Sequence, residues 1–254
     1  MGVIAVTGSA GGIGGAIRRQ IEAEGHDVIG VDVRDAEVVA DLSSAAGRSE
    51  ALDGIREAAG PALDGLVVAA GIGGSTSAPP SMVARINYFG AVALLDGLRE
   101  PLARGALHAA VAISSNSATA VPAQDLTLVE HCLSGREDEA ADHADTLDGE
   151  LVYAHAKLAL ARRVRRLAVE WAPDVRVNAV APGPVLTPLT QAALEHPVTG
   201  DLIRSYPIPL DRWGEPEEIA AGVWFLLSPA AAWITGVLLF IDGGTDALLR
   251  PDGI

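Results

Sequence analysis

Short apolar runs alternate along the chain with longer stretches in which apolar residues recur at helical spacing. The runs are rich in Val, Ile, Leu and Ala, and polar or glycine residues follow them. Runs that are apolar throughout are typical of parallel strands buried on both faces by helices. The seven runs are centred on Val3, Val28, Val38, Leu66, Val111, Val177 and Leu238.

The stretches between these runs predict helices, among them residues 16–24, 44–59, 82–99 and 151–163. Alternation of strand and helix favours the α/β class, in which each crossover returns to a parallel strand. We therefore predict a Rossmann-type, doubly wound sheet of about seven parallel strands with helices on both faces. Because no internal repeat or long low-complexity linker divides the chain, we expect a single domain over residues 1–254.

The composition narrows the partners and the compartment. Hydrophobic residues make up 49% of the 254 residues and aromatic residues only 4%, so the core must be aliphatic. A formal net charge of -15 argues against nucleic acid and anionic membrane surfaces, because both are bound through Lys and Arg. The single cysteine, Cys132, cannot form an internal disulfide, and no segment is typical of a signal peptide or a membrane span. We expect a cytoplasmic protein.

The first predicted strand leads directly into a glycine-rich turn, and a helical pattern follows at once. Glycines let backbone N–H groups approach a pyrophosphate, and the helix N-terminus adds partial positive charge. The glycine spacing differs from the common dinucleotide fingerprint, but its position between strand and helix favours the same role. The residues predicted to hold a dinucleotide here are Gly8, Gly12, Ile13 and Gly14.

The second predicted strand ends at Asp32. A carboxylate about 20 residues beyond such glycines accepts hydrogen bonds from the adenosine ribose hydroxyls and repels a 2′-phosphate. NAD is therefore the predicted cofactor, with NADP disfavoured. Arg34 keeps NADP open, because a guanidinium two positions further on could reach a 2′-phosphate.

Tyr153 and Lys157 are spaced so that a helix places both on one face, one turn apart. A lysine charge within about 4 to 6 Å favours the phenolate and lowers the tyrosine pKa. Such a tyrosine can pass a proton to and from an alcohol or carbonyl oxygen. The same spacing also occurs by chance in many helices, so the pair alone does not establish an active site. No His, Cys or Asp cluster has metal-ligand spacing, and we expect no metal.

Further residues join the glycine turn, Asp32 and the Tyr153–Lys157 pair in one characteristic order along the chain. The set is Thr7, Gly8, Gly12, Ile13, Gly14, Asp32, Asp41, Leu42, Ala69, Ala70, Gly71, Asn87, Ser115, Tyr153, Lys157 and residues 182–187. On these residues the chain resembles the short-chain dehydrogenase/reductase family over essentially its full length. This resemblance implies an enzyme that interconverts a secondary alcohol and a ketone by hydride transfer to or from NAD(P). Within the family, residues 25–37, 86–91 and 242–247 and an insertion before Tyr153 are similar to the bacterial 3α-hydroxysteroid dehydrogenases/carbonyl reductases, which implies a 3α-hydroxysteroid or a similar bulky apolar carbonyl compound as small-molecule substrate.

The resemblance also implies residue roles. Tyr153 is expected to act as acid or base, and Lys157 to lower its pKa and hold the nicotinamide ribose. Ser115, preferred to its neighbour Ser114, is expected to hydrogen-bond the reacting carbonyl, and Asn87 to hold a water next to Lys157. The further cofactor contacts that the family pattern implies are Asp41, Leu42, Ala70, Gly71, Pro182, Gly183, Val185 and Thr187. Ala69 stands where many relatives carry asparagine, which removes a hydrogen bond between neighbouring strands.

Two segments depart from the common core. An insertion at about residues 122–150 precedes Tyr153, with an apolar stripe over 126–133 and an acidic run over 137–150 that we expect to be solvated. Residues 186–209 are expected to form a lid over the substrate. Its apolar side chains either line a pocket or pack the lid on the body, and they are Leu189, Leu194, Ile203, Tyr206 and Pro207. Because the insertion should obstruct the helices through which the family commonly forms tetramers, we expect a homodimer through another surface rather than the usual homotetramer.

Two alternatives remain at this stage. One is a reductase of a different carbonyl compound, such as a terpene or a quinone. The other is a dinucleotide-binding scaffold that has lost turnover. The presence of Ser115, Tyr153 and Lys157 disfavours the scaffold.

Overall fold

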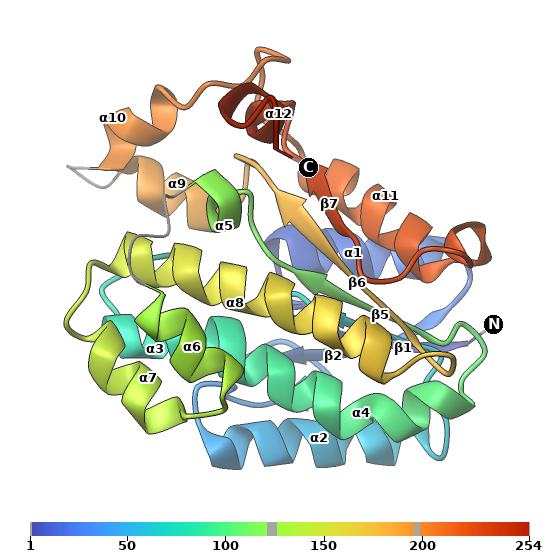
Figure 1. The fold of residues 1–254 in the computed structure, drawn as a ribbon. Helices are drawn as coiled ribbons and strands as arrows, with labels where there is room; N and C mark the ends of the chain where they lie inside the picture. Colours follow the sequence, from blue (N-terminus) through green and yellow to red (C-terminus); the bar gives the residue numbers. More distant parts are fainter. Residues whose placement is uncertain (1, 121–125, 196–198, 254) are drawn as a thin grey trace.

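The computed structural model describes residues 2–120, 126–195 and 199–253. Its centre is one sheet of seven parallel strands in the order β3-β2-β1-β4-β5-β6-β7, as the apolar runs predict (Figure 1). The order reverses between β1 and β4, which is the switch point of a doubly wound sheet. The strands are β1 (Val3–Thr7), β2 (Asp27–Asp32), β3 (Val38–Val39), β4 (Gly65–Val68), β5 (Ala109–Ile113), β6 (Arg176–Pro182) and β7 (Leu238–Ile241).

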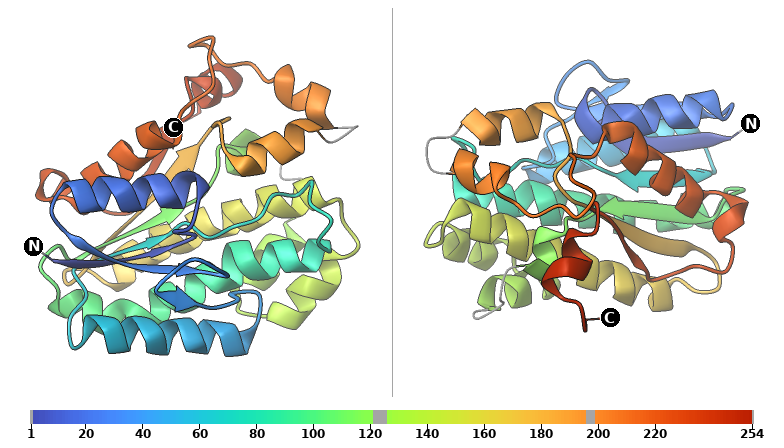
Figure 2. Two further views of the ribbon diagram at one scale, coloured as in Figure 1. Left: turned by 180° about the vertical axis from the view of Figure 1, so that it is seen from behind. Right: turned by 90° about the horizontal axis from the view of Figure 1, so that it is seen from above.

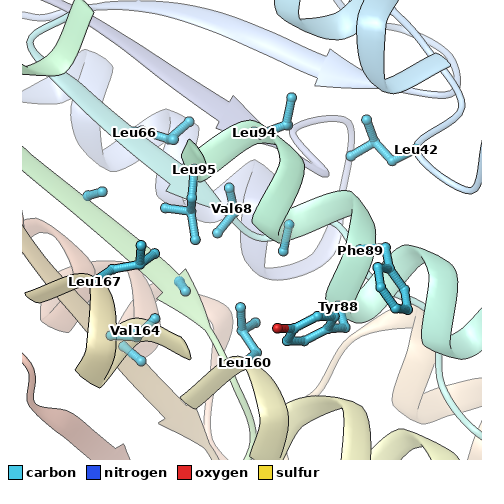
Figure 3. Close-up of a cluster of buried hydrophobic side chains, with 14 of the residues drawn as sticks. Leu42, Leu66, Val68, Tyr88, Phe89, Leu94, Leu95, Leu160, Val164 and Leu167 are labelled. Atoms are coloured by element: carbon cyan, nitrogen blue, oxygen red, sulfur yellow. The ribbon is translucent and has the colours of Figure 1, made fainter. Parts of the chain in front are cut away.

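Helices cover both faces of the sheet. On one face lie α1 (Gly12–Ala23) and α11 (Pro216–Leu227), which pack against each other (Figure 2). On the other lie α2 (Ala45–Ala59), α4 (Ala91–Arg104) and α8 (Gly149–Glu170). Each face has its own aliphatic core. Figure 3 shows part of the core on the face covered by α2, α4 and α8, where leucines of α4 and α8 contact strand residues such as Val68.

Shorter elements complete the fold, most of them near the carboxyl ends of the strands (Figure 1). These elements are α3 (Pro80–Ala84), the π-helical turn η1 (Arg85–Gly90), α5 (Ser117–Ala120), α6 (Thr127–Leu133), α7 (Glu137–Ala144), α9 (Pro188–Glu195), α10 (Thr199–Arg204), the 3-10 turn η2 (Pro229–Ala231) and α12 (Thr245–Leu249). The turn at Pro229–Ala231 lies near the amino ends instead, where Arg176 at the start of β6 donates a hydrogen bond to the Ala231 carbonyl.

The single helix predicted over residues 82–99 is wrong in detail. Three segments, α3, η1 and α4, occupy residues 80–104, and the middle one is wound as a π-helix. Single π turns inside α-helices are rare and occur often at functional sites. This turn carries Asn87, one of the predicted site residues.

The insertion packs on the body of the protein rather than extending into solvent. α6 lies against α8, and α7 lies against α3. Leu128 and Val129 are buried in the same core as Tyr88 and Leu160, as the apolar stripe predicts, while residues 121–125 lie outside the described part. The expectation of a solvated acidic face holds for Asp138, which is 93% exposed, but it is wrong for Glu137, which forms ion pairs with two arginines.

None of the described helices is both long and apolar enough to cross a bilayer. Within the same residues, no group of three His, Cys, Asp or Glu side chains is arranged to hold a metal ion.

Candidate active site

A cavity of about 570 Å³ lies at the carboxyl ends of the strands. All the predicted catalytic and cofactor residues border it, although they come from eight segments of the chain. The predicted residues that line the cavity are Gly8, Gly12, Ile13, Gly14, Asp32, Asp41, Leu42, Ala70, Gly71, Asn87, Ser115, Tyr153, Lys157, Pro182, Gly183, Val185 and Thr187. The fold thus brings together what the sequence distributes over 180 positions.

The glycine turn has the close backbone approach that a phosphate cradle needs. Gly8 and Gly12 have φ values of 69° and 54°, a region that favours glycine. A side chain at Gly14 would overlap the carbonyl oxygen of Gly8, so α1 can begin this close to β1 only with glycine there. Thr7 Oγ1 accepts hydrogen bonds of 2.9 Å from the N–H groups of Ala69 and Ala70, which ties β1 to the end of β4.

Asp32 is held in place at the adenosine end of the cavity. Its two carboxylate oxygens accept hydrogen bonds from Ala10 N at 3.0 Å and Val33 N at 2.8 Å. These bonds fix the carboxylate beside the glycine turn, where a ribose would lie. Arg34 also borders the cavity, so the ambiguity that the sequence raised about a 2′-phosphate is present in the structure too.

Tyr153 and Lys157 lie on one face of α8, with the Lys157 Nζ atom 5.7 Å from the centre of the Tyr153 ring. Lys157 is buried, and its Nζ donates a 2.9 Å hydrogen bond to the Ile113 carbonyl. Burial lowers the pKa of Lys157 to about 8. Burial also raises the pKa of Tyr153, while a hydrogen bond with Ser115 acts in the opposite direction.

The direction of the Tyr153 pKa differs from the one predicted. The expected lowering required a strong effect of the Lys157 charge, but the causes that act on the phenol are burial, Ser115 and the carboxylate of Glu150. Burial dominates because it withdraws the phenolate from water. Tyr153 and Lys157 therefore have the predicted spacing, but in the protein without cofactor the Tyr153 pKa is raised and not lowered.

The two adjacent serines have different partners. Ser114 is buried and its hydroxyl donates a 2.9 Å hydrogen bond to the Lys157 carbonyl, which fastens β5 to α8. The Ser115 oxygen accepts a 2.9 Å hydrogen bond from Ser117 and interacts with Tyr153. Since Ser114 has a structural bond and Ser115 meets the phenol, the geometry favours Ser115 as the catalytic serine.

Asn87 is completely buried in η1. Its side-chain nitrogen donates to the Ile72 carbonyl at 2.8 Å, and its oxygen accepts from the Ile72 N–H at 3.2 Å. A Cβ on Gly71 would lie 2.5 Å from the Asn87 oxygen and 3.4 Å from Lys157 Nζ. Asn87 thus fixes the loop after β4 close to the lysine, and its expected contact with a water stays a prediction.

Some residues that border the cavity were not predicted from the sequence. Thr190 accompanies Thr187, their hydroxyls 3.1 Å apart, and Thr190 Oγ1 donates to the Val185 carbonyl at 2.6 Å. Two threonines three residues apart at a helix start are the signal that could have revealed it. The others that went unpredicted are Ala10, Gly11, Val31, Val33, Ala40, Ile72, Ile86, Ile113 and Pro188.

The predicted apolar pocket residues of segment 186–209 are only partly described. Leu194, Tyr206 and Pro207 do not border the 570 Å³ cavity. The side chains of Leu189 and Ile203 lie outside the described part of the structure. Their role in binding a substrate therefore stays a prediction.

Comparisons with known proteins agree with this geometry. A model of enoyl-(acyl carrier protein) reductases matches residues 141–246, and a model of the NAD dependent epimerase/dehydratase family matches residues 4–188. The chain is 41% identical to a 3-alpha-hydroxysteroid dehydrogenase/carbonyl reductase of Comamonas testosteroni, with 99% of both proteins covered.

Solved structures extend the likeness to three dimensions. The crystal structure of the 3-alpha-hydroxysteroid dehydrogenase from Pseudomonas sp. B-0831 complexed with NADH superposes with a TM-score of 0.97 at 44% identity, covering 99% of this chain and 100% of that one. A short chain dehydrogenase/reductase family protein superposes with a TM-score of 0.70 at 28% identity, covering 96% and 97% of the two chains. The chain therefore belongs to the short-chain dehydrogenase/reductase family, a family of NAD-dependent oxidoreductases.

Proposed function

We propose that this oxidoreductase uses NAD to interconvert a 3α-hydroxysteroid, or a similar bulky apolar secondary alcohol, and its ketone. The observation that carries this proposal is the shared cavity, which has Ser115, Tyr153 and Lys157 in its wall and the glycine turn with Asp32 in another part of the same wall. Two relatives that match over nearly the whole chain are described as 3-alpha-hydroxysteroid dehydrogenases, which supports this substrate class.

The chain's own residues fit the dinucleotide. The N–H groups of the turn around Gly8 and Gly12 suit the pyrophosphate, and Asp32 suits the adenosine ribose. When bound, NAD supplies the hydride acceptor, so the protein needs to supply only position and a proton path. Asp32 favours NAD over NADP because a 2′-phosphate would meet its negative charge.

The residues around Tyr153 supply that proton path. In oxidation the Tyr153 oxygen takes the proton of the substrate alcohol, and in reduction it returns a proton to the carbonyl oxygen. Ser115 donates a hydrogen bond to the same oxygen and holds it against Tyr153. The Lys157 ammonium stabilises the phenolate, which is the base in oxidation and is the form left after Tyr153 gives up its proton in reduction. The raised pKa of Tyr153 keeps the phenol protonated in the free protein, which is the form that reduction needs, so oxidation depends more strongly on Lys157 to stabilise the phenolate.

Turnover of a substrate panel tests this function. Purified protein is given NAD and matched alcohols, namely 3α-hydroxysteroids, their 3β epimers and small secondary alcohols, and NADH is followed by absorbance. We expect turnover of the 3α epimers with NAD and much weaker turnover with NADP. Activity confined to terpene alcohols or quinols would refute the steroid as the substrate class. Absence of NADH binding would refute the dinucleotide site itself.

Two segments have proposed roles in this function. Residues 186–209, with α9 and α10, act as a lid over the substrate, supported by Thr187, Pro188 and Thr190 in the cavity wall. The insertion at about 122–150 covers α8 beside the site. We place the enzyme in the cytoplasm, and the buried lone thiol of Cys132 is compatible with a reducing compartment.

We also propose a homodimer formed through the β7 edge of the sheet. The insertion covers part of α8 and α3, which obstructs the helices that could otherwise pair. Large apolar side chains are exposed on the elements around this edge, Trp233 at 99% in the segment before β7, Val169 at 79% on α8 and Phe225 at 41% on α11. Aromatic residues such as Trp233 and Phe225 are enriched in protein interfaces.

A further inference from the structure

The insertion is anchored to the body of the protein through Glu137, at the start of α7. One carboxylate oxygen accepts from Arg48 Nη2 at 2.7 Å, and the other accepts from Arg85 Nη1 at 2.6 Å. Arg85 Nη2 also reaches Asp138 at 3.1 Å. Because Arg48 belongs to α2 and Arg85 to η1, one side chain joins three elements that are distant in the sequence.

This ion pair is shielded from solvent, unlike most others in the protein. The side chains of Arg48 and Glu137 are 8% and 23% exposed. Glu137 is the only acidic partner of Arg48 among the described residues, and Arg48 Nη1 is buried with no hydrogen bond there. Removing one charge of a buried pair leaves the other uncompensated, which costs far more than loss of an exposed pair.

Arg85 begins the turn on which Asn87 lies. The Asn87 side chain bonds to both backbone groups of Ile72, and its oxygen and Lys157 Nζ both lie next to Gly71, 2.5 Å and 3.4 Å from the place of a Cβ there. Single π turns are rare and are found often at functional sites. The ion pair of Arg85 with Glu137 fastens the first residue of this turn to α7, two residues from Asn87.

Arg48 lies at the other end of the site. It is in the first turn of α2, directly after the loop in which Asp41 and Leu42 border the cavity. Leu42 is also packed against the end of η1, since a Cβ on Gly90 would lie 3.0 Å from the Leu42 Cβ. The two segments that Glu137 joins therefore touch each other at the cavity wall.

Further bonds attach the insertion to the loop after β4. Asp145 accepts a 2.8 Å hydrogen bond from the Ser81 N–H, and Glu150 accepts one from Ser75. A side chain on Gly149 would overlap the backbone of Gly74. The insertion thus contacts the outer side of the same loop that Asn87 holds from within.

We propose that Glu137 is a positioning residue for the reaction, which holds η1 and the Asp41–Leu42 loop in the geometry that binds the dinucleotide. The inference rests on the proposed function, because the site it supports is the dinucleotide site. Glu137 does not border the cavity and acts only through Arg85 and Arg48. The insertion is then part of the scaffold of the active site and not only a cover over α8.

Three variants test this role. Glu137→Gln keeps the size and removes the charge, Glu137→Asp keeps the charge, and Glu139→Gln is a control on the same helix, whose carboxylate pairs with Arg136 and His131 of the insertion. We measure the NADH dissociation constant by fluorescence, without substrate, and kcat and KM with a secondary alcohol. We expect Glu137→Gln to weaken NADH binding about tenfold and lower kcat, Glu137→Asp to recover most of the loss, and Glu139→Gln to match the wild type.

Several results would overturn the proposal. One is a folded Glu137→Gln protein with the NADH affinity and kcat of the wild type. Another is a larger loss of NADH affinity and kcat in Glu137→Asp than in Glu137→Gln, because the effect would then follow the size of the side chain and not its charge. If Glu137→Gln does not fold, Arg85→Gln, which leaves the Arg48 pair intact, is measured, and unchanged kcat is then the contradicting result. Failure of the wild type to bind NADH would instead refute the proposed function.

Discussion

Tyr153 is the proposed acid and base of the reaction, and its hydroxyl can be removed with little other change. We expect Tyr153→Phe to lower kcat by ~10² to 10⁴-fold, because the substrate oxygen loses its acid and base. NADH binding should stay within about twofold of the wild type, because the ring remains. The comparison is Tyr88→Phe, which removes a phenol hydroxyl from the buried core rather than from the cavity. Steady-state rates and NADH fluorescence measure both, and retained turnover in Tyr153→Phe would refute its assigned role.

The lowered pKa of Lys157 leads us to expect that the stability of the protein depends on pH. Its pKa in the folded protein is about 8, below the ordinary value of 10.5. A buried lysine of this kind destabilises the folded state while charged, and the penalty disappears as the pH rises from below the folded pKa to the unfolded one. The free energy of unfolding of the wild type, minus that of Lys157→Met, should therefore increase between about pH 7 and pH 10. Urea unfolding without cofactor measures it, and a constant difference would contradict the shift.

At the residue scale, the sequence predicted which residues border the cavity better than it predicted their pKa values. Residue types such as Tyr153, Lys157 and Asp32 were recognisable because their chemistry depends on spacing after a strand or along a helix. The raised pKa of Tyr153 could not be recognised from the sequence, because it results from burial against residues of other segments. Glu137 was taken for a solvated residue for the same reason, since its partner Arg48 lies 89 positions earlier.

Arg176, at the start of β6, holds the end of α11. Its guanidinium donates to the carbonyl oxygens of Leu226 at 2.8 Å, Leu227 at 2.9 Å and Ala231 at 3.0 Å. These carbonyls lie at the end of α11 and in the turn that follows, where a cation also complements the helix dipole. Arg176→Met leaves them unpaired, so we expect a loss of about 2 to 4 kcal/mol in the free energy of unfolding.

Denaturant unfolding of Arg176→Met is compared with Arg165→Met. Arg165 is an exposed arginine that makes a single 3.4 Å hydrogen bond with the Gly236 carbonyl. Equal losses in the two variants would show that the α11 carbonyls find water as readily as Arg176, and would refute the capping role.

Elements were predictable where their pattern is local. All seven strands were found from apolar runs, and Ser44, the predicted start of a helix, caps α2 by accepting from the Gly47 N–H at 3.0 Å. The π turn at Asn87 was not predictable, because the residues of η1 have the same apolar spacing as an ordinary helix. The bonds of Asn87 to Ile72 and of Arg85 to Glu137 are tertiary, and no periodicity records them.

At the scale of the whole molecule, parallel strands determine where the site lies. Because their carboxyl ends meet at one edge, residues placed after β1, β2, β4, β5 and β6 had to converge there, and they border one cavity. The sequence could not show how the insertion packs, because that depends on contacts with α3 and α8. Substrate and assembly depend on surfaces, on which strand and helix patterns give no information.

The proposed dimer gives the last prediction. The two edges of the sheet both expose an apolar side chain, Trp233 beside β7 at 99% and Val39 on β3 at 60%. If the β7 edge is the interface, Trp233→Glu places a charge in a desolvated contact and should convert the dimer to a monomer, because an unpaired interfacial charge costs several kcal/mol. Val39→Glu makes the same change at the opposite edge and should leave the mass unchanged. Light scattering of the three proteins at equal concentration measures their masses. A dimer that persists in Trp233→Glu and dissociates in Val39→Glu would place the interface at the β3 edge. A tetrameric wild type would show that the insertion does not obstruct the helix surface used in the usual tetramer.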